Sequence, residues 1–424
     1  MKPAGRLGPS GPANPAGATV DGALLLNQLD ELAATARTPA GGVTRLAWSA
    51  EDRAARALIS KWGASAGLTT RPDAVANLIA DLPGTVAGLA PLVMGSHLDT
   101  VVDGGPLDGA YGTVAAFAVV TALAAAGERL RHPVRAVAWA NEEGVVAPPF
   151  SGSRAAAGLT IDMGALGPDG RRLSDRLAEE GGRLVSIASA AWGPVAGYLE
   201  LHIEQGPVLD RSGIPVGVVS GITAAKRGWA RFEGHANHAG TTPMHLRADA
   251  LVAAAHTVLA VQRLATSGPV AVATAGAIEA HPGITNVIAG RSAVSVDIRS
   301  LDGSALATAW ARLNQEVGDI AVQTATTGTL SEVSCTAPVP TDARLRGAIA
   351  DAAGQLGLAT TELASGAGHD AQCLAALGPI GMIFVPSIGG LSHHPAEATA
   401  PDDLVAGAEV LLGALRLADE RLDR

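Results

Sequence analysis

The stretch Met94–Gly112, with the sequence MGSHLDTVVDGGPLDGAYG, decides the fold class of this chain. An apolar run, Pro91–Met94, leads into it and predicts a buried strand that ends near His97. A glycine-rich loop with Asp99 and Asp108 follows, and the Ala- and Val-rich segment after the loop predicts a helix. Open α/β sheets place their functional groups at the carboxyl ends of their strands. We therefore expect His97 and Asp108 to be two ligands of a two-metal site at such a strand end.

Strand-like and helical segments alternate on both sides of this stretch, which favours a mostly parallel α/β sheet. The apolar runs of this pattern lie at 74–79, 91–96, 134–140 and 198–203. Beyond 215 the order changes to βαββαβ, which is typical of ferredoxin-like domains. A long strand or a strand pair is expected there at 216–233, and further strands at 270–278, 291–299 and 320–333.

The α/β pattern resumes after this segment, so we expect an insertion into a discontinuous larger domain. The expected parts are a disordered tail at 1–19, a catalytic domain at 20–215 and 331–424, and an inserted domain at 216–330. The tail is assigned from its Pro, Gly and Ala content and its lack of periodicity.

Composition excludes several classes of function. The 424 residues carry a formal charge of −10 with dispersed Lys and Arg, so we expect neither nucleic acid nor an anionic membrane as partner. The two cysteines, Cys335 and Cys373, exclude a disulfide framework and a thiolate metal site. No apolar leader follows Lys2 and Arg6, and the apolar run 113–126 is too short to span a membrane. We expect a cytoplasmic protein.

Polar clusters recur after the predicted strands of the larger domain, and this recurrence favours one shared site. The clusters are His97/Asp99/Asp108, Asn141–Glu142–Glu143, His202/Glu204/Gln205 and Ser392–His393–His394. Two divalent ions about 3.5–4 Å apart need a bridging carboxylate and several imidazole or carboxylate ligands. One ion would bind His97, Asp108 and His202. The other would share Asp108 and add Glu143 and His393.

Supporting groups can be named around these ligands. Asp99 is placed to accept the second ring N–H of His97. Glu142 and Glu143 are neighbours, so both can reach the site only from a turn. One would bind metal while the other acts as general base to the attacking water, and chemistry alone does not decide between them. These ligands suit Zn²⁺, Mn²⁺, Co²⁺ or Ni²⁺.

Motifs along the whole chain resemble a family of di-metal amidases. They are GSHLDT…GGPLDGAYG, NEEG, LELHIEQGP, GHANHAGTTPM, GITNVIAG, VDIRS, SGAGHDA and LSHHPAE, spread over about residues 20–420. The family contains N-carbamoyl-L-amino-acid hydrolases and allantoate amidohydrolases of the hydantoinase/carbamoylase type, and it is related to di-zinc carboxypeptidases and aminoacylases. The resemblance implies a metallopeptidase-like catalytic domain with Zn²⁺ as the first expectation. It implies that Glu142 is the general base and that the ligands are His97, Asp108, Glu143, His202 and His393.

The resemblance also implies substrate-binding residues and a homodimer formed through the inserted lid domain. Arg299 can bind a carboxylate bidentately, although a surface salt bridge is the alternative. His238 can donate to the developing oxyanion, and in the family it reaches the site of the partner subunit. Gln205 and Asn286 would bind the carboxylate or ureido group, with turn stabilisation as their alternative role. Backbone N–H groups around Gly368 could receive an anion.

The expected reaction is hydrolysis of the ureido C–N bond of an N-carbamoyl-L-amino acid to the amino acid, CO₂ and ammonia. Allantoate and 3-ureidopropanoate are the nearest alternative substrates. More distant alternatives are a dipeptidase or aminoacylase on the same scaffold, and a non-catalytic binding protein that keeps the fold. The presence of the base together with all five ligands speaks against a binding protein.

Overall fold

The structure, a computed structural model, describes residues 17–180 and 190–422, so most of the predicted tail lies outside the described residues. The chain forms two compact units. The first consists of Met1–Val219, Thr341–Glu362 and His369–Arg424, and the second of Ser220–Pro340 and Leu363–Gly368. The second unit extends past the expected end at 330 because it includes β11 (Thr327–Cys335) and β12 (Val339–Pro340).

The first unit contains a large sheet and most of the helices that the structure describes. Its strands are β1 (Thr70–Pro72), β2 (Leu78–Leu82), β3 (Leu92–His97), β4 (Val134–Trp139), β5 (Gly197–Ile203) and β14 (Ile380–Val385). The strands β6 (Val216–Ile222) and β13 (Thr360–Ser365) begin in this unit and end in the second. Its helices are α1 (Gly22–Ala34), α2 (Ala50–Ser65), α3 (Ala110–Ala125), α4 (Ser151–Ala156), α5 (Leu173–Glu179), α7 (Val208–Ser212), α10 (Ala343–Gln355), α11 (Ala371–Leu374) and α12 (Pro401–Arg421), with a 3₁₀ turn η3 (Ile388–Gly390).

The sheet is mixed, which confirms the predicted fold class. Its strand order is β1-β2-β4-β3-β5-β14-β6-β12, and β13 pairs with β6. The central strands β4, β3, β5 and β14 run parallel to one another, whereas β2 is antiparallel to β4, and β6 to β14. The four parallel strands therefore end at the same edge of the sheet.

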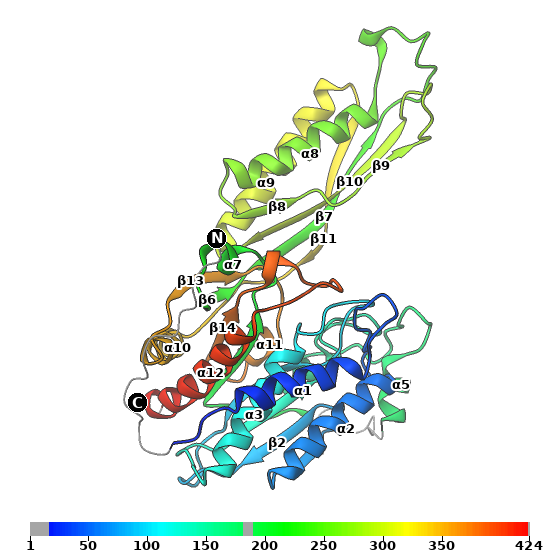
Figure 1. Ribbon diagram of the computed structural model, residues 1–424. Coiled ribbons are helices and arrows are strands. Elements are labelled where there is room, and N and C mark those ends of the chain that lie inside the picture. Colours follow the sequence, from blue (N-terminus) through cyan, green and yellow to red (C-terminus); the bar gives the residue numbers. More distant parts are fainter. Residues whose placement is uncertain (1–16, 181–189, 423–424) are drawn as a thin grey trace, which may run out of the picture. The chain divides into compact units, whose positions relative to one another are not determined.

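Burial explains why these segments form the centre of the unit. Every residue of β3 is buried, as is typical of parallel strands covered on both faces. Helix α3 is buried on nearly all sides, since it packs on β3, β4 and β5 and is itself contacted by α1, α2 and α12 (Figure 1). The same core fixes the start of α3, and with it the loop that carries Asp108.

The second unit has the predicted ferredoxin-like arrangement. Its antiparallel sheet has the order β11-β7-β10-β8, with β9 also paired to β10, and the helices α8 and α9 pack on it (Figure 1). The elements are β7 (Ala224–Glu233), α8 (Ala250–Thr266), β8 (Val272–Thr274), β9 (Ile278–His281), β10 (Arg291–Ser300) and α9 (Gly303–Gln323), with a 3₁₀ turn η2 (Met244–Leu246).

Three predicted strands differ from the structure. The segment 320–333 begins as helix, because Ile320 and Ala321 continue the buried face of α9. The segment 270–278 is divided between the short strands β8 and β9. The run 74–79 lies mostly before β2, in a turn where the Asp73 carboxylate accepts the Val75 and Asn77 N–H groups.

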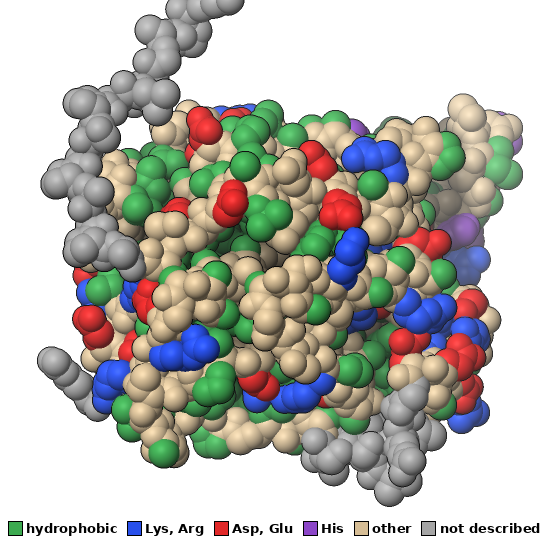
Figure 2. Space-filling view, turned by 60° about the horizontal axis from the view of Figure 1, so that its bottom comes forward, with side chains coloured by type: hydrophobic (Ala, Val, Ile, Leu, Met, Phe, Trp, Pro, Cys, Tyr) green, Lys and Arg blue, Asp and Glu red, His purple; other side chains and the backbone are tan. Residues whose placement is uncertain are grey.

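The distribution of surface charge and the apolarity of the helices are relevant to binding of nucleic acid or membrane. On the face of the molecule in Figure 2, Lys and Arg side chains alternate with Asp and Glu and form no continuous basic area. None of the helices among residues 17–180 and 190–422 has the length and apolarity needed to cross a membrane.

Candidate metal centre

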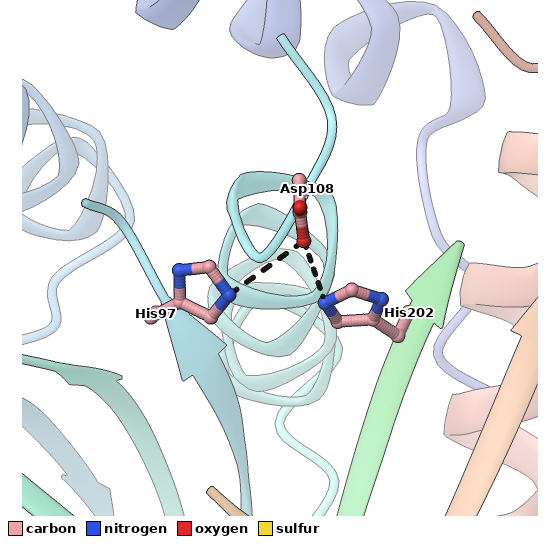
Figure 3. A group of neighbouring side chains, drawn as sticks. All are labelled: His97, Asp108 and His202. Atoms are coloured by element: carbon pink, nitrogen blue, oxygen red, sulfur yellow. Dashed lines mark ion pairs between the residues drawn. The ribbon is translucent and has the colours of Figure 1, made fainter. Parts of the chain in front are cut away.

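The parallel strands of the first unit bring the predicted ligands to one place. His97 is the last residue of β3 and His202 lies near the end of β5, while Asp108 comes from the loop before α3 (Figure 3). Glu143 follows β4, and His393 follows β14. These positions are the carboxyl ends of neighbouring parallel strands, where such sheets carry their chemistry.

The carboxylate of Asp108 lies between two sets of ligands. Its Oδ1 lies 3.7 Å from His97 Nε2 and 3.1 Å from His202 Nε2 (Figure 3). Its Oδ2 lies 3.0 Å from His393 Nε2, which is 3.5 Å from Glu143 Oε1. Within each set the potential ligand atoms lie within 4.8 Å of one another. The described residues thus contain two candidate metal sites that share Asp108.

Backbone carbonyls orient two of the histidine rings. The Nδ1–H of His97 donates to the Asp99 carbonyl oxygen at 2.9 Å, and that of His202 to the Ile203 carbonyl at 2.8 Å. Because a carbonyl can only accept, each Nδ1 carries the proton and each Nε2 faces Asp108 as a potential ligand. The prediction that the Asp99 carboxylate accepts this N–H was wrong, since its Oδ1 lies 4.0 Å from His97 Nδ1.

The Asp99 carboxylate instead holds the two glutamates. Its oxygens accept the backbone N–H groups of Glu142 and Glu143, each at 3.1 Å. The preceding Asn141 has a left-handed backbone with φ 56°, and its side-chain amide donates to the Pro148 carbonyl. This turn lets both neighbouring glutamates reach the centre, as the sequence required.

Glu142 is the carboxylate of the pair that lies outside both candidate sites. Its Oε2 lies 3.8 Å from His97 Nε2, and its side chain is buried. Burial and the nearby Asp370 and Glu143 carboxylates raise its pKa well above the usual value. A carboxylate with this environment is suited to accept and return a proton near neutral pH.

The carboxylates and imidazoles of the centre shift one another's pKa. Burial and repulsion by Asp108 raise the pKa of Glu143 to about 8. Burial alone would raise the pKa of Asp108, but hydrogen bonds from His202 and His393 hold it well below its usual value. The same bonds raise the pKa of both histidines to about 9, against the effect of burial, whereas burial lowers the pKa of His97.

These features fit divalent cations. Burying several carboxylates together is costly unless cations neutralise them. Glu143 Oε1 is buried and accepts no hydrogen bond from the described residues, so it is free to bind an ion. Imidazole and carboxylate ligands suit Zn²⁺ as well as Mn²⁺, Co²⁺ or Ni²⁺.

The first histidine of the pair His393–His394 is the one at the centre. His393 has a left-handed backbone with φ 55°, which turns its ring toward Asp108. The His394 side chain is exposed, and its Nδ1 accepts the Ala396 N–H. His393 alone of the two therefore belongs to a candidate site.

Gln205 is the predicted substrate residue that lies in the first unit beside Asp108. Its Nε2 donates to Asp108 Oδ2 at 3.0 Å, and its backbone is left-handed with φ 59°. Its Oε1 is buried and has no hydrogen-bond partner among the described residues. This oxygen is available to accept an N–H group of a substrate.

The remaining predicted substrate residues lie in the second unit. The Arg299 guanidinium binds the Asp297 carboxylate through Nε and Nη2 and donates through Nη1 to the Gly366 carbonyl. His238 and Asn286 lie on adjoining loops. The Ala239 N–H donates to the Asn286 carbonyl at 2.9 Å and so connects the two loops. Gly368 is the last residue of this unit before His369.

Sequence reasoning missed buried polar groups next to the centre. Glu200 is fully buried on β5 and accepts from Ser96 Oγ at 2.8 Å and from the Ala371 N–H at 2.9 Å. The buried ring of His369 packs edge-on against His202, with 4.6 Å between the ring centroids. Glu200 lies two residues before His202 on the same strand, so both side chains point to the same face of the sheet. This spacing was the one signal in the sequence that could have identified Glu200.

The chain is similar to known proteins in both sequence and fold. Residues 93–417 match the model of "Peptidase family M20/M25/M40". An N-carbamoyl-L-amino acid amidohydrolase of Geobacillus stearothermophilus is 38% identical over 92% of this chain and 97% of its own length. An allantoate amidohydrolase of Bacillus subtilis is 35% identical over 88% and 91%. The crystal structure of a hydantoinase/carbamoylase-family amidase from Burkholderia multivorans superposes with a TM-score of 0.89 at 36% identity, covering 95% of this chain and 98% of that one.

Proposed function

The chain belongs to peptidase family M20/M25/M40, in its hydantoinase/carbamoylase group of amidases, and on this premise we propose that it hydrolyses N-carbamoyl-L-amino acids. The ureido C–N bond would be cleaved to give the amino acid, CO₂ and ammonia. The observation that carries the proposal is the shared Asp108 carboxylate between two His/carboxylate sets, with Glu142 beside them. Divalent ions held there would polarise the carbamoyl carbonyl and acidify water.

Glu142 is the group that moves the proton. Its carboxylate accepts a proton from the water that attacks the carbamoyl carbon. The protonated Glu142 then donates to the departing α-amino nitrogen as the C–N bond breaks, so the base is restored at the end of the cycle. The other product, carbamic acid, decomposes to CO₂ and ammonia. The raised pKa of Glu142, caused by burial and neighbouring carboxylates, makes its carboxylate a stronger base toward the attacking water.

Polar side chains would distinguish the substrate by its ureido group and its carboxylate. The unpartnered Gln205 Oε1 would accept a ureido N–H, and the Arg299 guanidinium would bind the carboxylate. Asn286 and the backbone at Gly368 would add hydrogen bonds to the same groups. His238 would stabilise the oxyanion in the site of a partner subunit, so the active form would be a homodimer.

Allantoate is a second candidate substrate. The allantoate amidohydrolase of Bacillus subtilis resembles this chain nearly as closely as the carbamoyl amino acid hydrolase does. Allantoate also carries a ureido group and a carboxylate, so the same residues could bind it. The groups around its α-carbon differ, and the pocket for these groups would decide between the two substrates.

A panel of substrates tests the proposal directly. The metal-free chain would be loaded with Zn²⁺, Mn²⁺, Co²⁺ or Ni²⁺ and assayed for ammonia release from N-carbamoyl-L-amino acids, allantoate, ureidoglycolate and 3-ureidopropanoate. A dipeptide and an N-acetyl amino acid, assayed for free amino acid, serve as comparison substrates. We expect the highest kcat/KM with an N-carbamoyl-L-amino acid. Turnover of the dipeptide or N-acetyl compound alone would contradict the ureido specificity.

A further inference from the structure

A buried carboxylate joins the two loops that carry Asp108 and His393. Glu397 is only 4% exposed, and its Oε1 accepts the backbone N–H groups of Leu107 at 2.9 Å and Asp108 at 3.0 Å. Its Oε2 accepts the Ser392 hydroxyl at 2.9 Å. One side chain therefore binds the loop before α3 and the loop after β14 at the same time.

Two further contacts fix Glu397 in this position. Its backbone N–H donates to the His394 carbonyl at 2.9 Å, so the carboxylate belongs to the same turn as His393. The glycine-rich loop passes directly against it, because a Cβ at Gly105 would collide with the Glu397 side chain. Glycine at 105 is thus what allows the carboxylate to reach the Asp108 backbone.

We infer that Glu397 is a positioning residue that holds Asp108 and His393 in the geometry needed for the second ion. The inference rests on the proposed function, in which Asp108, Glu143 and His393 bind that ion. Asp108 and His393 both come from loops, and Glu397 connects these loops. His97 and His202 lie instead on the strands β3 and β5, which the sheet holds in place. Loss of Glu397 therefore affects the second ion more than the first.

Asp419 provides a matched control. Its carboxylate also clamps two successive backbone N–H groups of a distant loop, those of Arg131 at 3.0 Å and His132 at 2.8 Å, and it is 5% exposed. This loop precedes β4, and so lies at the end of that strand opposite to Glu142 and Glu143. Both Glu397→Ala and Asp419→Ala thus remove a carboxylate that accepts two successive backbone N–H groups. The Glu397 carboxylate lies at the centre, and the Asp419 carboxylate lies away from it.

The experiment titrates Zn²⁺ into the metal-free full-length chain by calorimetry and measures the Tm of each metal-free variant. We expect Glu397→Ala to keep the first ion and to bind the second about 10–100-fold more weakly. Glu397→Gln, whose amide can accept the same N–H groups and donate to Ser392, is expected to restore the affinity. Asp419→Ala is expected to lower the Tm and to bind both ions with unchanged affinity.

Two results would overturn the inference: unchanged affinity for both ions in Glu397→Ala, or equal losses in Glu397→Ala and Asp419→Ala. If Glu397→Ala does not fold, Glu397→Asp, whose shorter side chain cannot reach both Ser392 and the N–H groups of Leu107 and Asp108, must weaken the second ion for the inference to stand. An unmodified chain that binds no Zn²⁺ would instead contradict the proposed function. Failure of the proposed role of Glu397 can thus be distinguished from failure of the proposed function.

Discussion

At the scale of the residue, Glu142 can be tested without disturbing the candidate metal sites, since it belongs to neither. Glu142→Gln keeps the size of the side chain but removes the base, so turnover should fall about 10²–10⁴-fold while metal content stays unchanged. Initial rates and metal analysis of the same preparation check this. Glu409→Gln is the control. Glu409 lies on helix α12, and its carboxylate accepts the Val20 N–H. Full turnover of Glu142→Gln would show that another group is the base.

Protons should compete with metal for the histidines. In the metal-free chain the pKa of His202 and of His393 is raised to about 9 by Asp108, so both imidazoles are protonated at neutral pH. An ion must displace these protons, so metal affinity should rise with pH between about 6 and 9 and level off above the raised pKa. Calorimetry in buffers of different ionisation enthalpy measures the protons released. A pH-independent affinity without proton release would contradict this account.

At the scale of the element, the start of α3 depends on Gly109. This residue has φ +63°, and a Cβ there would collide with the His97 ring. Gly109→Ala should therefore cost stability and displace a ligand of the first ion. Gly127→Ala is the matched control, because Gly127 follows the same helix with φ +66° and open space around its Cβ position.

Metal titration and thermal melts distinguish the two variants. Both substitutions should lower the Tm, since alanine in a left-handed conformation costs about 1–2 kcal/mol. Gly109→Ala alone should weaken metal binding. Equal metal affinity in the two variants would mean that the loop can move away from His97 without loss.

The predictability of the elements follows from how each is buried. Strands β3, β4, β5 and β14 are almost entirely buried and mostly apolar, so their position in the sequence and the residues that follow them were evident. Strand β13 alternates between exposed and half-buried residues and gave no such signal.

The sequence predicted the ligands of the site but not the contacts that hold them in place. The five proposed ligands lie at or beyond the ends of buried strands, and the structure brings them together. The partner of His97 was wrongly predicted because a loop conformation decides whether the carboxylate or the carbonyl of Asp99 faces the ring. Glu397 had no predicted role for another reason, since its contacts with Leu107 and Asp108 join residues that are 290 and 289 positions apart in the sequence.

At the scale of the whole molecule, the proposed homodimer with shared sites predicts complementation between inactive variants. Glu142→Gln and His238→Ala would each be inactive alone. In a mixed dimer one site would combine an intact Glu142 with the intact His238 of the other subunit. After subunit exchange, about a quarter of the unmodified activity should return. No recovery, with mass measurements showing mixed dimers, would place His238 in the site of its own chain or outside the mechanism.

The most direct test of the two-metal centre is anomalous diffraction from crystals of the Zn²⁺-loaded chain. We predict two peaks about 3.5–4 Å apart on either side of the Asp108 carboxylate, one beside His97 and His202, the other beside Glu143 and His393. A single peak, or peaks away from Asp108, would contradict the account.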